Sequence, residues 1–197
     1  MSKGKKTTYK YKCEESIING LEDQYELSEY EYNKLYKFFV TYSMCENQSD
    51  KKRTLADYGW ASTVKYSEIK KELKEKINFN IENFVFRDEG GLKDVCAENN
   101  LIINKVTLDS ERGVIGKTVG QNKLLKLFHR IRNIFSHGRF AMRLSGEDRY
   151  IIMEDKDSHN VTARIVIKLD TLIGIIDTID INHLTGERID TDVLVAA

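Results

Sequence analysis

The sequence has no proline, few cysteines and no excess of either charge, and each absence excludes some classes of protein. Proline interrupts helices and central strands, so its absence from all 197 residues favours regular elements. The three cysteines, Cys13, Cys45 and Cys96, are widely separated and odd in number. This pattern fits neither a disulfide framework nor a zinc knuckle, and it is typical of a reducing compartment. We therefore expect a cytoplasmic protein.

The sequence also lacks the patterns of membrane, secreted and metal-binding proteins. No apolar stretch is long enough to cross a bilayer, and no hydrophobic segment follows the lysine-rich first twelve residues as it would in a secretory signal. The four histidines show no HExxH spacing, so we expect neither a metal nor another cofactor. Hydrophobic residues make up 41% of the chain, which is enough to bury a core in a single domain.

Positive and negative charges are separated along the chain although they sum to zero. Residues 13–33 contain seven acidic side chains and no lysine or arginine, whereas residues 112–146 contain eight basic side chains and no acidic one. The second segment predicts a local basic surface, for which an ordinary solvated face is the alternative explanation. A further hypothesis is that the acidic segment shields this basic surface until the protein is activated.

Hydrophobic periodicity predicts a largely helical first half. The helices expected there cover residues 27–43, 67–76 and 92–98. Ser28 and Glu31 match a capping box at the start of the first helix. Residues 77–86 are compatible with a strand or with a short buried helix, and periodicity does not decide between them.

The second half contains the clearest helix of the chain, over residues 121–137, followed by strands. Its apolar stripe consists of Leu124, Leu125, Leu127, Phe128, Ile131, Ile134 and Phe135. Gly138 is placed to end it. The later strands are expected at residues 139–144, 149–154 and 161–169, with turns at 145–148 and 155–160, and a last helix at 171–179.

These elements predict a mainly α fold of the α+β type. It would be a helical bundle with a small antiparallel sheet of about three strands, residues 139–169, inserted before the last helix. We expect one domain over residues 1–197. Its parts would be a helical N-terminal part (1–90), a part that carries the chemistry described next (91–180) and a polar tail (181–197).

Polar side chains of three types cluster near the end of the helix expected over residues 121–137. Asn133 and His137 are four residues apart and therefore share a face. Arg132 lies about 140° round the helix from His137, but its side chain is long enough to reach the same phosphate. These positions make Arg132, Asn133 and His137 the candidate catalytic residues.

These residue types suit the cleavage of RNA without a metal. Histidine, with an ordinary pKa of about 6.5, exchanges a proton at neutral pH, and arginine donates hydrogen bonds to phosphate oxygens as charge develops. RNA supplies its own nucleophile, the 2′-hydroxyl group, so the protein needs no activated serine or water. The asparagine would orient the imidazole or bind the phosphate.

The run from Arg132 to Gly138 (RNIFSHG) resembles the R-x4–6-H signature of the HEPN superfamily, whose active nucleases usually carry a polar residue after the arginine. The helix, the strands and the closing helix resemble a plasmid- and phage-associated branch, weakly, to about residue 180. The resemblance implies a helical bundle in which Arg132 and His137 are catalytic and Asn133 is supportive. It also implies a homodimer with a composite site, acting on RNA in phage defence, in a toxin–antitoxin pair or in RNA processing. An antitoxin or another regulatory partner would then control it.

Five further residues near this motif are candidates for binding the RNA backbone. They are Lys126, His129, Arg130, Arg139 and Arg143. For each of them, an ordinary surface role is the alternative explanation.

Three other functions remain open at this point. The first is a catalytically inactive HEPN-like module that binds RNA, a nucleotide or a protein. The second is a winged-helix protein that binds DNA, although the helix over residues 121–137 is very apolar for a groove-reading helix. Residues 106–120 also contain glycines and look irregular, with no helix before a short turn. The third is a phage or host interaction protein that uses the acidic segment 13–33.

Overall fold

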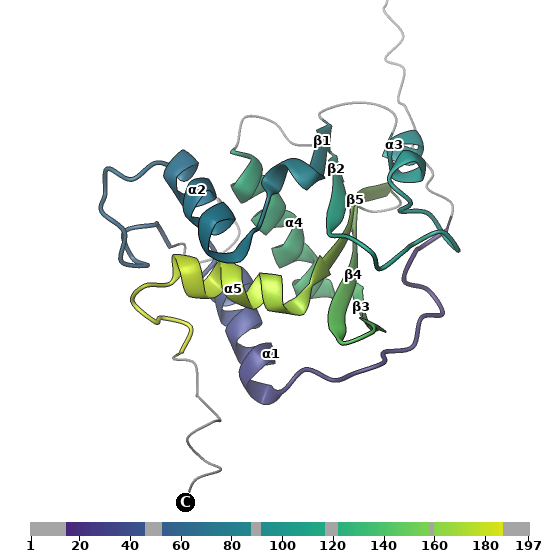
Figure 1. Cartoon of the computed structure of the whole chain (residues 1–197), viewed down its shortest axis with the longest axis horizontal. Helices are drawn as coiled ribbons and strands as arrows, with labels where there is room; N and C mark the ends of the chain where they lie inside the picture. Colours follow the sequence, from purple (N-terminus) through teal and green to yellow (C-terminus); the bar gives the residue numbers. More distant parts are fainter. Residues whose placement is uncertain (1–14, 46–52, 88–91, 117–121, 158–159, 187–197) are drawn as a thin grey trace, which may run out of the picture.

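A five-stranded mixed β-sheet forms the centre of the computed structural model (Figure 1). Its strands are β1 (Phe84–Arg87), β2 (Arg112–Gly116), β3 (Phe140–Ser145), β4 (Asp148–Asp157) and β5 (Asn160–Lys168), in the spatial order β1-β2-β5-β4-β3. β1 and β2 are parallel, and the other neighbouring strands are antiparallel. The structure describes residues 15–45, 53–87, 92–116, 122–157 and 160–186.

The helices divide between the two faces of this sheet. They are α1 (Glu29–Tyr36), α2 (Tyr66–Ile77), α3 (Leu92–Glu98), α4 (Lys123–His137) and α5 (Leu169–Ile179), with a π-helical segment at Lys37–Thr41 and a 3-10 turn at Ile81–Asn83. In Figure 1, α1, α2, α4 and α5 lie on one side of the strands and α3 lies on the other. The fold therefore has three layers.

The expectation of a mainly helical bundle with a small sheet of about three strands is wrong, because the five-stranded sheet organises an α/β fold. The three expected strands exist as β3, β4 and β5, but β1 and β2 extend the sheet. β2 is buried at all five positions and contains two glycines, so it shows no alternation of apolar and polar residues. A Cβ atom on Gly113 would lie 2.7 Å from the Phe84 ring, so this glycine allows close packing between neighbouring strands.

The main hydrophobic core lies between the sheet and the four helices α1, α2, α4 and α5. Ile151, Ile165 and Ile167 contribute to it from the sheet, and Phe38 and Phe39 from the π-helical segment.

The expected capping box is present at α1, where Glu31 N donates to Ser28 Oγ and Ser28 N donates to the Glu31 carboxylate. The helix expected over residues 27–43 is present as α1 and the π-helical segment after it, and those expected over 67–76 and 92–98 are present as α2 and α3.

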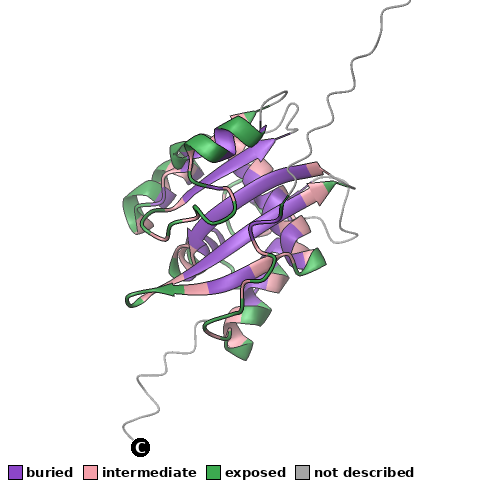
Figure 2. Cartoon of the chain, turned by 90° about the vertical axis from the view of Figure 1, so that its right-hand side faces the viewer, coloured by how far each residue is buried: buried purple, intermediate pink, exposed green. Residues whose placement is uncertain are grey.

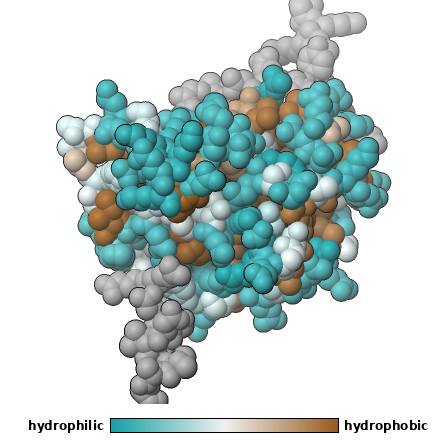
Figure 3. All heavy atoms as spheres, viewed as in Figure 1, coloured by the Kyte–Doolittle hydropathy of each residue, from teal (hydrophilic) through white to brown (hydrophobic). Residues whose placement is uncertain are grey.

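A smaller core covers the opposite face of the sheet. Ile17 lies there with Leu92 and Val95 of α3 and with Val114 and Val166 of the sheet. Figure 2 shows the strands largely buried, while the hairpin tip between β3 and β4 is exposed. The surface seen in Figure 3 is mainly hydrophilic, with hydrophobic atoms in separate groups.

Part of the acidic segment expected to shield a basic surface is built into the edge of the sheet. Gln24 N donates to the Met142 carbonyl oxygen, and Met142 N donates to the Asp23 carboxylate. Glu31 forms an ion pair of 2.8 Å with Arg149 of β4. These contacts make residues 23–31 a structural border of β3 and β4.

Candidate functional site

α4 is a well-anchored platform for the polar side chains that it carries. It begins after Asn122, whose side chain accepts a hydrogen bond from Leu124 N, and it ends at Gly138, whose φ of 61° is left-handed. Its buried residues are Leu124, Leu127, Phe128, Arg130, Ile131, Ile134 and Phe135. The helix expected over residues 121–137 and its glycine stop are thus confirmed.

A buried ion pair connects α4 to the sheet. Arg130 is only 8% exposed, and its guanidinium donates to the Asp155 carboxylate at 2.8 Å. It also donates to the Gly116 carbonyl oxygen at the end of β2 and to the Thr162 hydroxyl. Arg130, proposed from the sequence as an RNA contact, therefore holds the sheet to the helix from inside the protein.

A β-bulge brings Thr162 to this ion pair. Asp155 faces Ala163 in the pairing of β4 with β5, whereas the next residue of β4 faces Val161, so Thr162 is an extra residue on β5. The Thr162 hydroxyl donates to the Asp155 carboxylate at 2.8 Å. Asp155 was expected in a turn over residues 155–160, which is wrong, because the Arg130 guanidinium and this hydroxyl make a buried carboxylate tolerable within the strand.

Asn133 lies beside this ion pair, and its side-chain amide contacts three polar groups. Arg132 Nη1 donates to Asn133 Oδ1 at 3.1 Å. Asn133 Nδ2 lies 3.5 Å from the Asp155 carboxylate and 3.4 Å from His129 Nε2. Arg132, Asn133 and His129 are all half-buried, so they form a partly accessible cluster on α4 that rests on a buried support.

His129 is the imidazole that meets the other polar groups of this cluster. Burial lowers its pKa below the ordinary value, and the positive charges of Arg130 and Arg132 lower it further, while the Asp155 carboxylate acts in the opposite direction. The lowered pKa favours the neutral form of the His129 imidazole.

His137 lies in the last turn of α4, as expected, but its imidazole is separate from the cluster round Asn133. It is exposed in the last turn of α4, and its imidazole makes no hydrogen bond or ion pair within the part of the chain that the structure describes. The side chain of Asn133 lies within hydrogen-bonding reach of His129, four residues before it, and makes no side-chain hydrogen bond with His137, four residues after it. The structure thus brings Arg132 and Asn133 together and leaves His137 one turn away on the surface.

The basic surface expected from residues 112–146 is smaller than the sequence suggests. Lys123 pairs with Glu82, and Lys117 lies outside the described residues. Arg139 and Arg143 each donate to a backbone carbonyl, that of Lys156 and that of Glu22 respectively. Lys126 is half-exposed on α4, three residues before His129. Lys126, Arg132, Arg139 and Arg143 are half-buried, so part of each side chain lies at the surface.

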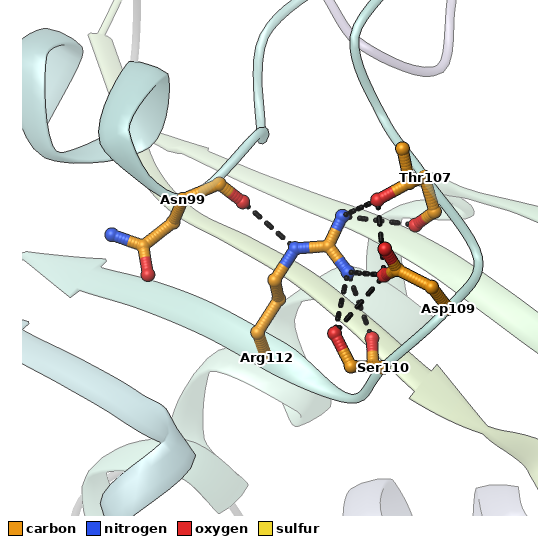
Figure 4. Close-up of polar contacts among 5 residues, drawn as sticks. All are labelled: Asn99, Thr107, Asp109, Ser110 and Arg112. Atoms are coloured by element: carbon orange, nitrogen blue, oxygen red, sulfur yellow. Dashed lines mark hydrogen bonds and ion pairs between the residues drawn. The ribbon is translucent and has the colours of Figure 1, made fainter.

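Arg112, another member of the basic segment, holds together the loop that leads into β2 (Figure 4). Its Nε donates to the Asn99 carbonyl oxygen, at the end of α3. Nη2 donates to both oxygens of Thr107, and Nη1 donates to Ser110 and Asp109. Every guanidinium nitrogen is engaged, so Arg112 is a structural residue.

Replacing Arg112 with alanine is expected to lower the free energy of unfolding by about 1–3 kcal/mol, because three backbone carbonyls lose a charged donor. Urea unfolding followed by circular dichroism measures the change. Arg87→Ala, at the exposed end of β1, is the matched control and should have an effect below about 0.5 kcal/mol. Equal effects of the two substitutions would contradict the structural role of Arg112.

Sequence reasoning did not find Asp155 and Thr162, which support the cluster. Asp155 follows the apolar residues of β4, and Thr162 lies near the start of β5. No local sequence pattern marks either residue as a partner of α4. Among the described residues, no group of three histidine, cysteine, aspartate or glutamate side chains is arranged to hold a metal ion, and no helix has the length and apolar character to cross a membrane.

Comparison with known proteins adds no relative. A scan against protein-family models finds no match for the chain, and searches of curated proteins and of solved structures find none either. The resemblance to the HEPN superfamily therefore rests on the motif that begins at Arg132 and on the elements that follow it.

Proposed function

We propose that this chain is a metal-independent endoribonuclease whose site lies on α4 at Arg132, Asn133 and His137. The observation that supports this proposal best is the contact of the Arg132 guanidinium with Asn133 Oδ1, at 3.1 Å. The amide is held in turn by the buried Asp155 carboxylate. A guanidinium held in this way on a rigid helix is suited to bind a phosphate whose charge increases in the transition state.

The proposed reaction uses the nucleophile that RNA carries. The 2′-oxygen attacks the adjacent phosphorus, the bond from phosphorus to the 5′-oxygen breaks, and a 2′,3′-cyclic phosphate and a 5′-hydroxyl group form. Arg132 stabilises the phosphate, and His137 takes part in proton transfer from its exposed position. Asn133 positions the Arg132 guanidinium.

We propose a homodimer for the working form, in line with the resemblance to the HEPN superfamily. One exposed imidazole and one guanidinium, five residues apart on α4, are few groups for catalysis, and a second copy of the chain would add another pair. Phage defence or a toxin-like role in the cytoplasm, under an antitoxin or another regulator, is the biological setting that this resemblance suggests.

Wild-type protein is expected to cleave single-stranded RNA in the presence of EDTA, and His137→Ala is expected to cleave it about 10²–10⁴ times more slowly, the usual contribution of a positioned acid or base. The rate of loss of end-labelled RNA measures the effect. His183→Ala, at an exposed histidine in the turn after α5, is the matched control and should retain the wild-type rate. Equal cleavage by wild type and His137→Ala would remove the nuclease proposal, and sensitivity to EDTA would contradict its metal-free mechanism.

Binding of RNA without cleavage is the alternative function that one observation favours. The Asn133 side chain makes a hydrogen bond with Arg132 and none with His137, so the phosphate-binding group is better organised than the proton-transfer group. Tight, salt-dependent RNA binding with no product would support this alternative. A groove-reading helix of the winged-helix type is less compatible with α4, since seven of its residues are buried in the fold.

A further inference from the structure

The structure points to a second imidazole in the proposed site, and this inference rests on the proposed function. We infer that His129 is a catalytic residue that accepts the proton of the RNA 2′-hydroxyl group through Nε2. The sequence motif does not include His129, and its role follows from the contacts of Asn133 together with its place beside Arg132.

The contacts of Asn133 define which atom of its amide faces His129. Arg132 Nη1 is a hydrogen-bond donor only, so the atom that it contacts at 3.1 Å is the amide oxygen. The Asp155 carboxylate accepts hydrogen bonds from Arg130 and from the Thr162 hydroxyl, and an ionised carboxylate has no hydrogen to donate. The amide atom beside it at 3.5 Å is therefore the NH2 group. Two independent neighbours thus orient the amide in the same way.

This orientation determines the state of the His129 ring. The Asn133 NH2 group lies 3.4 Å from His129 Nε2 and has only hydrogen atoms to offer, so Nε2 carries a lone pair and the ring proton is on Nδ1. A contact of 3.4 Å is at the long limit of hydrogen bonding, so a hydroxyl group of a substrate can replace it at small cost.

The charged groups round His129 keep this lone pair available. Arg130 and Arg132 on α4 oppose a proton on the imidazole, and among the described residues the Asp155 carboxylate of β4 is the charged group that favours one. That carboxylate is already occupied by the Arg130 guanidinium and the Thr162 hydroxyl. Burial acts in the same direction as the two arginines and lowers the pKa of His129.

His129 also lies closer to the phosphate-binding group than His137 does. His129 and Arg132 are three residues apart, about 60° round the helix, and are therefore neighbours on its surface. Arg132 and His137 are five residues apart and about 140° round the helix. A phosphate bound by Arg132 thus presents its adjacent ribose to His129 more readily than to His137.

In the step that follows, the proton of the 2′-hydroxyl group moves to His129 Nε2 while the 2′-oxygen forms its bond to phosphorus. The bond from phosphorus to the 5′-oxygen breaks with its electron pair, and the 5′-oxygen takes a proton from His137. No oxidant, metal or further reactant is needed. His129 ends protonated and His137 ends deprotonated, so His129 then returns its proton to solvent and His137 takes one up.

Two substrates separate the two imidazoles. RNA has a poor leaving group that needs a proton, whereas 2-hydroxypropyl 4-nitrophenyl phosphate releases 4-nitrophenolate without one, although its hydroxyl group still needs a base. His129→Gln is expected to lose about 10²-fold or more in kcat/KM on both substrates. His137→Gln is expected to lose as much on RNA but little on the nitrophenyl ester, and His183→Gln is the matched control.

The pH profile supplies a readout that a merely structural role of His129 would not change. The acidic limb of wild-type kcat/KM reports the protonation of the base, and because the pKa of His129 is lowered, activity should persist below pH 6.5. The residual activity of His129→Gln should no longer show this acidic limb. Its dissociation constant for RNA should stay within about twofold of wild type.

The outcomes of these assays are distinct. Wild type that cleaves neither substrate would remove the proposed function, and the inference with it. Wild type that cleaves both, with His129→Gln retaining the rate and the acidic limb, would overturn the inference alone.

Discussion

Replacing Asp155 with alanine is expected to lower the free energy of unfolding by about 3–5 kcal/mol, the usual cost of leaving one partner of a buried ion pair alone. Asp155 is 2% exposed and accepts hydrogen bonds from the Arg130 guanidinium and the Thr162 hydroxyl. Alanine would leave the guanidinium of Arg130, which is 8% exposed, without its carboxylate. Urea unfolding followed by circular dichroism measures the loss.

Two further variants show whether the buried charge causes this effect. Replacing both partners, Arg130→Met with Asp155→Leu, removes the unpaired charge and should recover most of the lost stability. Recovery should stay incomplete, because the Gly116 carbonyl and the Thr162 hydroxyl then lack a partner. Asp148→Ala, which breaks a surface ion pair with Lys168, should cost less than about 1 kcal/mol. An Asp155→Ala effect as small as that of Asp148→Ala would contradict a structural role for the ion pair.

The parts of the fold that sequence reasoning predicted are those in which a repeating pattern reflects burial. The apolar stripe on α4 repeats at helical spacing because only one side of that helix enters the core, and Gly138 ends it by adopting a left-handed conformation. The three later strands were found because polar turns separate them. Their order along the chain was also predicted correctly. The error in fold class came from β1 and β2, which extend the sheet.

The parts that were missed are those in which burial is complete or comes from distant contacts. β2 is buried on both faces, and Gly113 stands where the Phe84 ring approaches, so glycine there marks close packing rather than a break. β1 has only four residues and pairs in parallel with β2 through a connection that includes α3. Neither feature leaves a periodic pattern.

The candidate site shows the same limit at the scale of single side chains. A residue on a helix shares its face with those four positions before and four after it, so the sequence alone does not say whether Asn133 contacts His129 or His137. In the structure, Arg132 and Asp155 orient the Asn133 amide, and its NH2 group meets His129. The deciding residue, Asp155, lies 22 positions later on β4.

A heterodimer of His129→Gln and His137→Gln is expected to regain about half of the wild-type activity on RNA, although each variant alone is at least about 10²-fold slower. The reason is distance. His129 and His137 are eight residues apart on α4, a rise of about 12 Å, and their side chains lean in the same direction along the helix. One phosphodiester does not span this length, so in the proposed homodimer we expect His129 of one copy to act with His137 of the other.

In a symmetric dimer built in this way, each site takes one imidazole from each chain. A heterodimer of the two variants has one site with both replacements and one site with none, so one of the two sites works. Co-expression with two different affinity tags, followed by purification on both, isolates this species for assay beside the two single-variant homodimers. A heterodimer as inactive as its parents would mean that both imidazoles serve one chain, and the eight-residue spacing would then have to be bridged by the RNA. Recovered activity would instead identify the dimer as the catalytic unit, since neither chain alone holds a complete site.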